Sequence, residues 1–326
     1  MFDVITVGSA TVDVFARTEF CEMIRDKKKE ECIAYPVGSK ILIKELILSS
    51  GGGGTNAAVA LSRLGHKVAF LGKMGTFENS HRVILDLQKE HVNTSLIIRK
   101  PNSRTGYSII LDSIKHDRTI LVFRGSNNDL RYNEVKASKL KAKWFYFSTM
   151  MGQSYKTLEK LALYTEKNKI KIMFNTSSYL AKKGIPYLRP ILKRTDILVL
   201  NKEEAMLLAG KNKIKPLLRK LHKAGPKIVA ITDGKNGVYV FDGNHFYFAK
   251  PHKVKVVETT GAGDAFASSF LSGIIRKNDI EFAIKLGMTN AESVIQYHGA
   301  KNKLLTYKEA LKEMKKRPIK VIKRII

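Results

Sequence analysis

VVETTGAGDAFASSF, residues 256–270, holds a glycine turn, GAG at 261–263, followed by apolar residues at helical spacing. Phe266 and Phe270 fall on one face of the expected helix, which indicates that this helix is buried. The preceding residues 254–260 are rich in valine and threonine and are predicted to form a strand. A strand, a tight turn and a buried helix in succession are typical of an α/β fold.

The glycine turn predicts an anion-binding site at the start of this helix. The first N–H groups of a helix have no partner inside it and carry the positive end of the helix dipole. Glycines allow a ligand to approach that backbone closely. We therefore expect the amides of Gly261, Ala262, Gly263 and Asp264 to form a cradle suited to a phosphate group.

Asp264 is unexpected in such a cradle, because a carboxylate repels phosphate. A phosphoryl transferase, however, uses a base to accept the proton of the attacking hydroxyl group. Asp264 is therefore a candidate base, and the alternative is that it is only a favourable acid in a first helical turn. The chain has no P-loop motif, and Phe266 replaces the third glycine of a dinucleotide-binding fingerprint.

Strand-like apolar runs alternate with helical patterns along most of the chain. This alternation predicts an α/β fold in which a mostly parallel central sheet lies between two layers of helices. The predicted strands cover 3–10, 67–75, 144–149, 170–177, 196–201 and 227–234, and predicted helices include 56–65, 155–168 and 202–210.

Two segments depart from the alternation and are predicted to form a lid. Residues 31–50 and 104–124 have the alternating, half-polar character of paired antiparallel strands set apart from the main sheet. From Tyr307 onward the pattern indicates a basic amphipathic helix followed by a short tail.

The charge of the chain allows two interpretations. Its 58 Lys and Arg against 29 Asp and Glu give a net charge of +29, which is compatible with a nucleic-acid or polyanion partner. The basic residues are scattered along the sequence, however, which favours a lysine-rich surface that also helps to hold an anionic substrate.

No apolar run is long enough for a membrane span, and the first twenty residues lack the basic leader of a signal peptide. Cys21 and Cys32 do not make a disulfide framework, so we expect free thiols and a cytoplasmic location.

Three further motifs place polar residues beside glycines or strand ends. SGGGGTNAAVALSRLG, residues 50–65, offers a backbone that a polyol can approach, with Asn56 at the start of a helix. ITDGKNGVYVFDG, residues 231–243, is predicted to be a strand, a glycine turn and a hairpin. LNKEEA, residues 200–205, ends a strand where α/β proteins bind ligands. The alternatives are a flexible turn with a capping Asn, a simple hairpin turn and an acid-rich helix start.

Taken together, these motifs resemble those of the ribokinase-like sugar kinases, also called PfkB carbohydrate kinases. The resemblance runs from VGSATVD to HGAK near residue 300. GGGGTNAAVALSRLG looks like the family's N-terminal signature and ETTGAGDAFASSF like its C-terminal signature, with NKEE and TDGKNG between them. DRTILVFRGSNNDL, residues 117–130, is similar to the return strand of the family's lid.

The resemblance implies one ribokinase-like domain over residues 1–326 that uses ATP and Mg²⁺ to phosphorylate a sugar hydroxyl, as ribokinase or fructokinase does. Asp264 then matches the catalytic base, with the amides of Gly261, Ala262 and Gly263 in its anion hole. The substrate-binding positions are Thr11, Asp13, Gly52, Gly53 and Asn56. The nucleotide-binding positions are Asn201, Glu204, Thr232, Gly234, Gly237 and Asn290, and Glu204 also matches a residue that holds Mg²⁺ through water.

The chain departs from the family pattern in three places, one of which is GTFENS, residues 75–80, where the usual paired acids after the strand are missing. Gly53 stands where some sugar-specific members have Lys, so the resemblance does not imply ribose. Glu258 replaces the usual Asp which, in potassium-activated members, helps to hold a monovalent cation, so Glu258 and Thr260 are the candidate ligands for K⁺. We expect Lys303, near the end of the same loop, to supply a positive charge that partly replaces this cation.

Two other functions stay open on the sequence. The first is a nucleoside kinase of the same family, and the second is a nucleic-acid or polyanion binder on a kinase fold, which only the net charge of +29 supports. The expected partners are a small-molecule sugar or nucleoside and a second copy of the chain paired through the lid strands.

Overall fold

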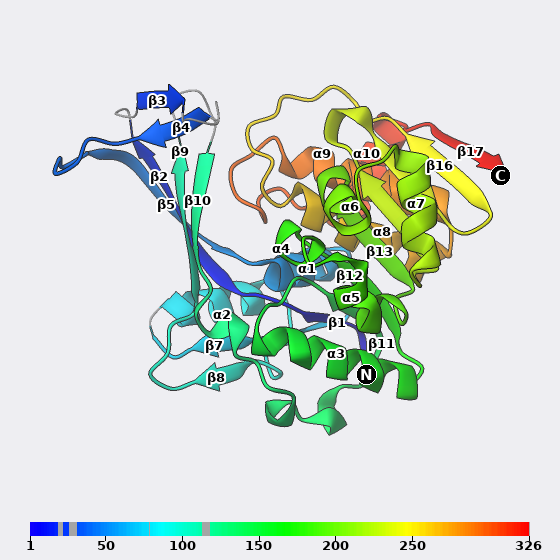
Figure 1. Ribbon diagram of the computed structural model, residues 1–326, viewed down its shortest axis with the longest axis horizontal. Coiled ribbons are helices and arrows are strands. Elements are labelled where there is room, and N and C mark those ends of the chain that lie inside the picture. The colour runs from blue at the N-terminus through cyan, green and yellow to red at the C-terminus, as the bar shows by residue number, and fades with distance from the viewer. Residues whose placement is uncertain (19–21, 26–30, 78, 113–117, 326) are drawn as a thin grey trace.

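The computed structural model describes residues 1–18, 22–25, 31–77, 79–112 and 118–325. Its main sheet has nine strands in the order β17-β16-β15-β14-β13-β12-β11-β1-β6 (Figure 1). The six parallel strands are β1 (Phe2–Val7), β6 (Val68–Leu71), β11 (Ala142–Phe147), β12 (Lys171–Asn175), β13 (Ile197–Asn201) and β14 (Ile228–Thr232). The antiparallel edge consists of β15 (Val238–Phe241), β16 (His245–Ala249) and β17 (Val321–Ile325).

Helices cover both faces of this sheet, because successive side chains of each buried strand point to opposite faces. On β11, Trp144 and Tyr146 belong to one apolar core and Phe145 and Phe147 to the other. The first layer contains α1 (Gly53–Arg63), α2 (Asn79–Lys89), α8 (Ala262–Lys277), α9 (Ile280–Val294) and α10 (Tyr307–Lys316). The second contains α3 (Gln153–Lys167), α4 (Ser178–Ala181), α5 (Gly184–Leu192), α6 (Lys202–Ala209) and α7 (Ile214–Lys223). The predicted α/β architecture is confirmed.

A smaller sheet projects from one end of the main body (Figure 1). Its strand order is β10 (Arg118–Phe123), β9 (Gly106–Asp112), β2 (Thr11–Thr18) and β5 (Ile43–Gly51). The sequence placed lid strands at 31–50 and 104–124, but the structure divides the first segment into β4 (Glu31–Ala34), which pairs with β3 (Glu22–Arg25), and β5. It also adds β2 as a central strand, parallel to β9 and antiparallel to β5.

Two other segments differ from the sequence prediction. Residues 254–260 form no strand, because the amides of Val257 and Glu258 both donate to the carbonyl of Ile295, at 2.8 and 3.1 Å, and not to a sheet. The tail after α10 becomes β17, which pairs with β16 and extends the main sheet. A further parallel pair joins β7 (Lys73–Gly75) and β8 (Ile98–Lys100). Cys21 lies outside the described residues. None of the helices in the described ranges is long and apolar enough to cross a bilayer.

Candidate active site

Asp264 lies in the first turn of α8, where the glycine turn brings the backbone into a tight bend. Gly261 has a φ of 82°, and a Cβ at this position would lie 2.5 Å from the Cα of Ala300. Glycine is therefore required there, both for its backbone conformation and for the close packing. The turn thus holds the start of α8 against the loop that follows α9.

The amides at this turn are not equivalent. The amide of Ala262 donates to the carbonyl of Thr259 at 3.3 Å and closes the turn. The amides of Gly263 and Asp264 have no backbone partner in the described part of the chain. A Cβ at Gly263 would meet nothing within 4 Å, so the space in front of this turn is open. The predicted anion cradle therefore consists chiefly of these two amides, with Ala262 committed to the turn.

The carboxyl group of Asp264 faces the first glycine motif. Its Oδ2 accepts a hydrogen bond from Asn56 Nδ2 at 2.9 Å, and Asn56 lies in the first turn of α1. Burial raises the pKa of Asp264 to about 6, against the opposing effects of the Asn56 hydrogen bond and the charge of Lys301. Asn56 Oδ1 is buried and has no partner among the described residues, which leaves it available to a ligand hydroxyl group.

Glycines keep the space around these groups free of side chains. A Cβ at Gly53 would lie 2.2 Å from Ser148 Oγ and 3.6 Å from Asp264 Oδ1. A Cβ at Gly51 would lie 1.8 Å from Asp13 Oδ2. Gly52 caps α1 with a φ of 97°. The glycine run therefore allows two carboxylates to approach the backbone.

Asp13 lies on β2, at the junction between the main sheet and the small sheet. Burial raises its pKa, and hydrogen bonds with Ser108 and Thr11 act in the opposite direction. Thr11 Oγ1 donates to Asp13 Oδ1 at 2.8 Å, so Thr11 orients this carboxylate. The structure thus joins Thr11 to Asp13 and Asn56 to Asp264, and the assignment of Thr11, Asp13 and Asn56 to substrate binding stays a prediction.

Lys301 is a residue of this site that the sequence reasoning missed. Its Nζ donates to Ser50 Oγ at 2.9 Å, at the end of β5. Burial lowers the pKa of Lys301 to about 8, although the negative charges of Asp86, Asp13, Glu90 and Asp264 oppose this change. The only sequence signal was its place in HGAK, at the end of the family resemblance.

The prediction for Lys303 is wrong. Its side chain is exposed, and its ammonium lies over the ring of Tyr297, 5.4 Å from the centroid. Its charge acts on Glu309, at the start of α10, and not on the site of Asp264. The backbone turns between the two lysines, so Lys301 faces inward and Lys303 outward.

The nucleotide-side residues lie at the carboxyl ends of two neighbouring strands. Asn201 and Thr232 are register partners on β13 and β14. Asn201 Oδ1 accepts from the amide of Glu204 at 2.8 Å, and Glu204 Oε2 accepts from the amide of Asn201 at 2.9 Å, so the two residues also cap α6. Burial is the main cause that raises the pKa of Glu204 to about 7, and the negative charge of Asp264 contributes to the same shift.

The turn between β14 and β15 is built on glycines. Gly237 has a φ of 116°, and a Cβ there would lie 2.4 Å from the carbonyl oxygen of Ala249. Gly234 has a φ of 49°, and a Cβ there would meet nothing within 4 Å. The predicted glycine turn and hairpin are therefore present, with open space beside Gly234.

Asn290 does not line this region, and its assignment to the adenine pocket is corrected. Its side chain is fully buried. Its Nδ2 donates to Ser269 Oγ at 2.7 Å and its Oδ1 accepts from the amide of Leu305 at 3.0 Å. Both ends of the amide are thus used to join α8, α9 and the segment before α10.

The candidate cation ligands lie beside the glycine turn. Glu258 is buried, and its Oε2 accepts from the amide of Gly299 at 2.9 Å and lies 3.7 Å from His298 Nδ1. Thr260 Oγ1 is buried without a partner in the part of the chain that the structure describes. Within those same residues, no group of three or more His, Cys, Asp or Glu side chains could hold a metal ion.

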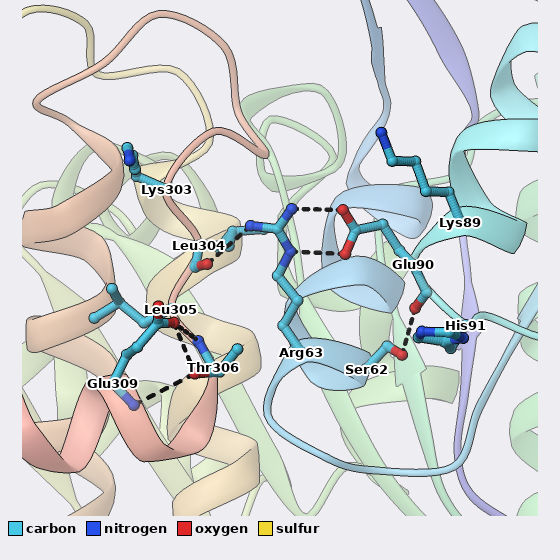
Figure 2. Close-up of a pocket in the computed structure, with 10 residues that line it drawn as sticks. All are labelled: Ser62, Arg63, Lys89, Glu90, His91, Lys303, Leu304, Leu305, Thr306 and Glu309. Carbon is cyan, nitrogen blue, oxygen red and sulfur yellow. Dashed lines mark hydrogen bonds and ion pairs between the residues drawn. The ribbon is translucent and has the colours of Figure 1, made fainter.

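A cavity of about 520 Å³ lies elsewhere, between the ends of α1 and α2 and the start of α10 (Figure 2). Arg63 crosses it, with Nε and Nη2 donating to both carboxylate oxygens of Glu90 at 2.7 and 2.5 Å and Nη1 donating to the carbonyl of Leu304 at 2.9 Å (Figure 2). None of the residues predicted for catalysis or for substrate, nucleotide or cation binding lines it, although Lys303 does. Its charged centre is satisfied internally, so it is not the candidate active site.

Comparison with known proteins identifies related sequences over most of the chain. The model of the pfkB family carbohydrate kinases matches residues 1–306. An uncharacterized sugar kinase of Archaeoglobus fulgidus is 30% identical over 76% of this chain and 98% of its own length. The ribokinase of Staphylococcus aureus is 27% identical over 91% of this chain and 94% of its own. The cytidine kinase of Thermococcus kodakarensis is also 27% identical, over 92% of this chain and 98% of its own.

Solved structures share the fold at lower identity. The nucleoside kinase of Methanocaldococcus jannaschii superposes with a TM-score of 0.80 at 20% identity, covering 97% of this chain and 99% of its own. The ribokinase of Arabidopsis thaliana, complexed with ribose and ATP, gives a TM-score of 0.82 at 21% identity and covers 96% and 99%.

Proposed function

The chain belongs to the pfkB family of carbohydrate kinases, and we propose that it transfers the γ-phosphoryl group of ATP to a sugar hydroxyl with Asp264 as general base. One observation carries this assignment of roles. The hydrogen bond from Asn56 to Asp264 joins residues 208 positions apart, so both glycine motifs contribute to one site. A structural acid in a first helical turn would need no such partner from the other motif.

Asp264 is suited to accept a proton near neutral pH. Its pKa of about 6 leaves it mainly ionised at pH 7, yet keeps it basic enough to accept the proton of a hydroxyl group as that group attacks. The hydrogen bond from Asn56 fixes one carboxylate oxygen and leaves the other for the acceptor.

The start of α8 provides the matching stabilisation of negative charge. The amides of Gly263 and Asp264 lie at the positive end of a sixteen-residue helix and have no backbone partner in the described residues. These donors are suited to the oxygens of a phosphoryl group in transfer.

The acceptor sugar is held on the opposite side of Asp264. Asp13, oriented by Thr11, accepts hydrogen bonds from sugar hydroxyl groups. The unpartnered Asn56 Oδ1 accepts another, and Gly52 and Gly53 allow the sugar to lie against the backbone. The small sheet, which carries Asp13, would close over the sugar and exclude water that otherwise hydrolyses ATP.

The residues of the nucleotide side fit ATP and Mg²⁺. Thr232, Gly234 and Gly237 offer an open glycine turn for the nucleotide. Asn201 and Glu204 would hold Mg²⁺ through water, since Glu204 is a partly buried acid whose raised pKa a nearby divalent cation would lower. When bound, Mg²⁺ neutralises charge on the transferring phosphates.

A monovalent cation fits beside the anion hole. Glu258 and Thr260 supply oxygen ligands there, and Thr260 Oγ1 is an unpartnered buried oxygen in the described chain. When bound, the cation would add positive charge next to the start of α8.

Exposed apolar residues on both faces of the small sheet support a dimer. Exposed large apolar residues on three of its strands are Ile43, Leu46, Ile47, Ile109, Ile120, Leu121, Val122 and Phe123, and because side chains alternate along a strand they are divided between its two faces. Covering such apolar surface is stabilising, and a second copy offers the same surface. We place the enzyme in the cytoplasm, where ATP and sugars are available.

A nucleoside is the second candidate acceptor, because relatives named cytidine kinase and nucleoside kinase match nearly the whole chain. A screen of ADP release in a coupled assay, against pentoses, hexoses, sugar phosphates and nucleosides, decides between the classes. We expect turnover with a sugar. Turnover only with nucleosides would replace the sugar by the second candidate, and no acceptor-dependent ADP release would refute the kinase assignment.

The polyanion alternative is tested on the same preparation. We infer that the net charge of +29 is spread over the surface and does not form a nucleic-acid site. Tight, steeply salt-dependent RNA or DNA binding by fluorescence anisotropy would contradict this inference.

A further inference from the structure

Lys301 has an ammonium group whose hydrogen-bonding capacity is largely unused. The residue is partly buried in the loop that follows α9. Its Nζ donates to Ser50 Oγ at 2.9 Å, and Ser50 is itself buried. Within the described ranges, Lys301 forms no other hydrogen bond and no ion pair. An ammonium has three N–H donors, so two of them have no partner among the described residues.

An incompletely paired ammonium in a desolvated position is unfavourable. Buried charges in proteins are normally paired, because the lost hydration otherwise costs several kcal/mol. The lowering of the pKa of Lys301 to about 8 shows that burial outweighs the attraction of the surrounding carboxylates. A ligand that supplied oxygens to the two remaining donors would remove this cost.

The charges around Lys301 come from two directions. Asp86 acts on it from α2 and Glu90 from the residue that follows α2, and Glu90 is already bonded to Arg63. Asp13 and Asp264 act on it from the acceptor site. None of these four carboxylates is ion-paired to Lys301 within the described chain, so the ammonium keeps donors for a ligand although it lies within reach of the charges of both site carboxylates.

Two further features link Lys301 to the groups around Asp264. Asn56 Oδ1, on the residue that bonds Asp264, is buried and unpartnered among the described residues. Gly261 packs directly on Ala300, which fixes the residue before Lys301 against the anion-hole turn. The ammonium is therefore held by the same turn that positions Asp264.

We propose that Lys301 is a specificity-determining residue of the acceptor site, donating hydrogen bonds to an oxygen of the sugar next to the hydroxyl that Asp13 binds. The proposal rests on the proposed function, because it assigns a role within the same acceptor site.

Together, Lys301 and Asp13 define which chemical groups the acceptor must carry. An ammonium only donates hydrogen bonds, and an ionised carboxylate only accepts them. Asp13 therefore requires a hydroxyl that donates, and Lys301 requires an oxygen that accepts. Adjacent hydroxyl groups of a polyol meet both requirements, whereas an apolar edge of a nucleobase meets neither.

The test compares K301M, K301R and K303M, using the best sugar from the screen and its series of monodeoxy derivatives at saturating ATP and Mg²⁺. Removing one charge-assisted hydrogen bond to a ligand costs about 10- to 100-fold in affinity. We expect K301M to raise the KM for the parent sugar by about that factor while kcat changes by less than about threefold. K301R, which keeps the charge, should recover part of the loss, and K303M, whose side chain faces Tyr297, should match wild type.

The deoxy series identifies the contact. For one derivative, the wild-type enzyme should already show the raised KM, and K301M should add nothing, because the partner oxygen is missing. The proposal is wrong if K301M leaves every KM unchanged, if it raises KM by the same factor for every derivative, or if it lowers kcat alone. Thermal melting and ATP binding verify that the variant folds, and K301Q replaces it if K301M does not.

Failure of the two proposals can be told apart. A wild-type enzyme that is inactive with every sugar refutes the proposed function and this role of Lys301 together. An active wild-type enzyme with a Lys301 variant of unchanged KM refutes only the role of Lys301.

Discussion

Asp264→Asn changes the candidate base while keeping its shape. Asparagine cannot accept the proton of the attacking hydroxyl, and a positioned general base contributes about 10²–10⁴-fold to the rate. We expect kcat to fall by that factor, with little change in the KM for ATP. The contact with Asn56 can persist, because an amide oxygen at position 264 can accept the same 2.9 Å hydrogen bond.

The same substitution is expected to stabilise the fold. Raising the pKa of Asp264 from 3.8 to about 6 corresponds to at most about 3 kcal/mol at ~1.4 kcal/mol per pH unit. Because the folded pKa is raised, this contribution to stability is present below about pH 4 and is lost as the pH rises through about 6. An asparagine side chain at this position does not titrate and has no such dependence. The free energy of unfolding of the variant should therefore exceed that of wild type at pH 7.5 and approach it near pH 4.

The assay combines acceptor-dependent ADP release with urea denaturation at both pH values. Asp279→Asn is the matched control, because Asp279 caps α9 by accepting from the amides of Glu281 and Phe282, far from the acceptor groups along the chain. It should keep wild-type turnover. Wild-type turnover in the Asp264 variant would remove this residue from the mechanism, and an unchanged pH dependence of stability would refute the burial argument.

Three other properties of the site can be measured. First, kcat/KM should fall as the pH drops below about 7. Glu204, with a pKa of about 7, and then Asp264, with a pKa of about 6, lose their negative charge by protonation in this range. A flat profile of kcat/KM from pH 5 to 8 would contradict this. Second, Gly261→Ala should destabilise the fold by ~1–3 kcal/mol and abolish most activity, because the added Cβ would lie 2.5 Å from the Cα of Ala300. The control Gly210→Ala, at a φ of 87° with nothing within 4 Å of the added Cβ, should retain activity. Equal activity of the two variants would refute the packing argument. Third, Asn290→Ala should lower the free energy of unfolding by ~1–3 kcal/mol, since the substitution leaves the Ser269 hydroxyl and the Leu305 amide without this partner. The KM for ATP should not rise. A raised KM would restore Asn290 to the nucleotide site.

Local chemistry explains which parts of the fold could be predicted from sequence. The GAG turn and the spacing of Phe266 and Phe270 are short-range features, and they located the start of α8 within two residues. Residues 254–260 have the composition of a strand, but the amides of Val257 and Glu258 bond to the carbonyl of Ile295, a contact that is distant in sequence. β2 and β17 were missed as members of their sheets, because pairing with β9 and β16 depends on contacts distant in sequence.

In the candidate site, too, features that are local in sequence could be predicted and features that depend on tertiary packing could not. Asn56 and Asp264 could be paired because each follows a glycine turn that begins a helix. Asn290 could not be recognised as structural, because its partners Ser269 and Leu305 are brought together only by packing. Lys301 and Lys303 are two residues apart in a polar loop, and nothing in the sequence shows which of them faces inward. The contact of Gly261 with Ala300 decides it, and that contact is tertiary.

The most direct test follows the fate of the phosphoryl group. With γ-³²P-labelled ATP, Mg²⁺ and the best acceptor, we predict that the label moves to the sugar in a one-to-one ratio with ADP formed, and that this transfer is nearly lost when Asp264 is replaced by asparagine. Label that stays on ATP with every acceptor, or that is released only as inorganic phosphate, would contradict the proposed kinase activity.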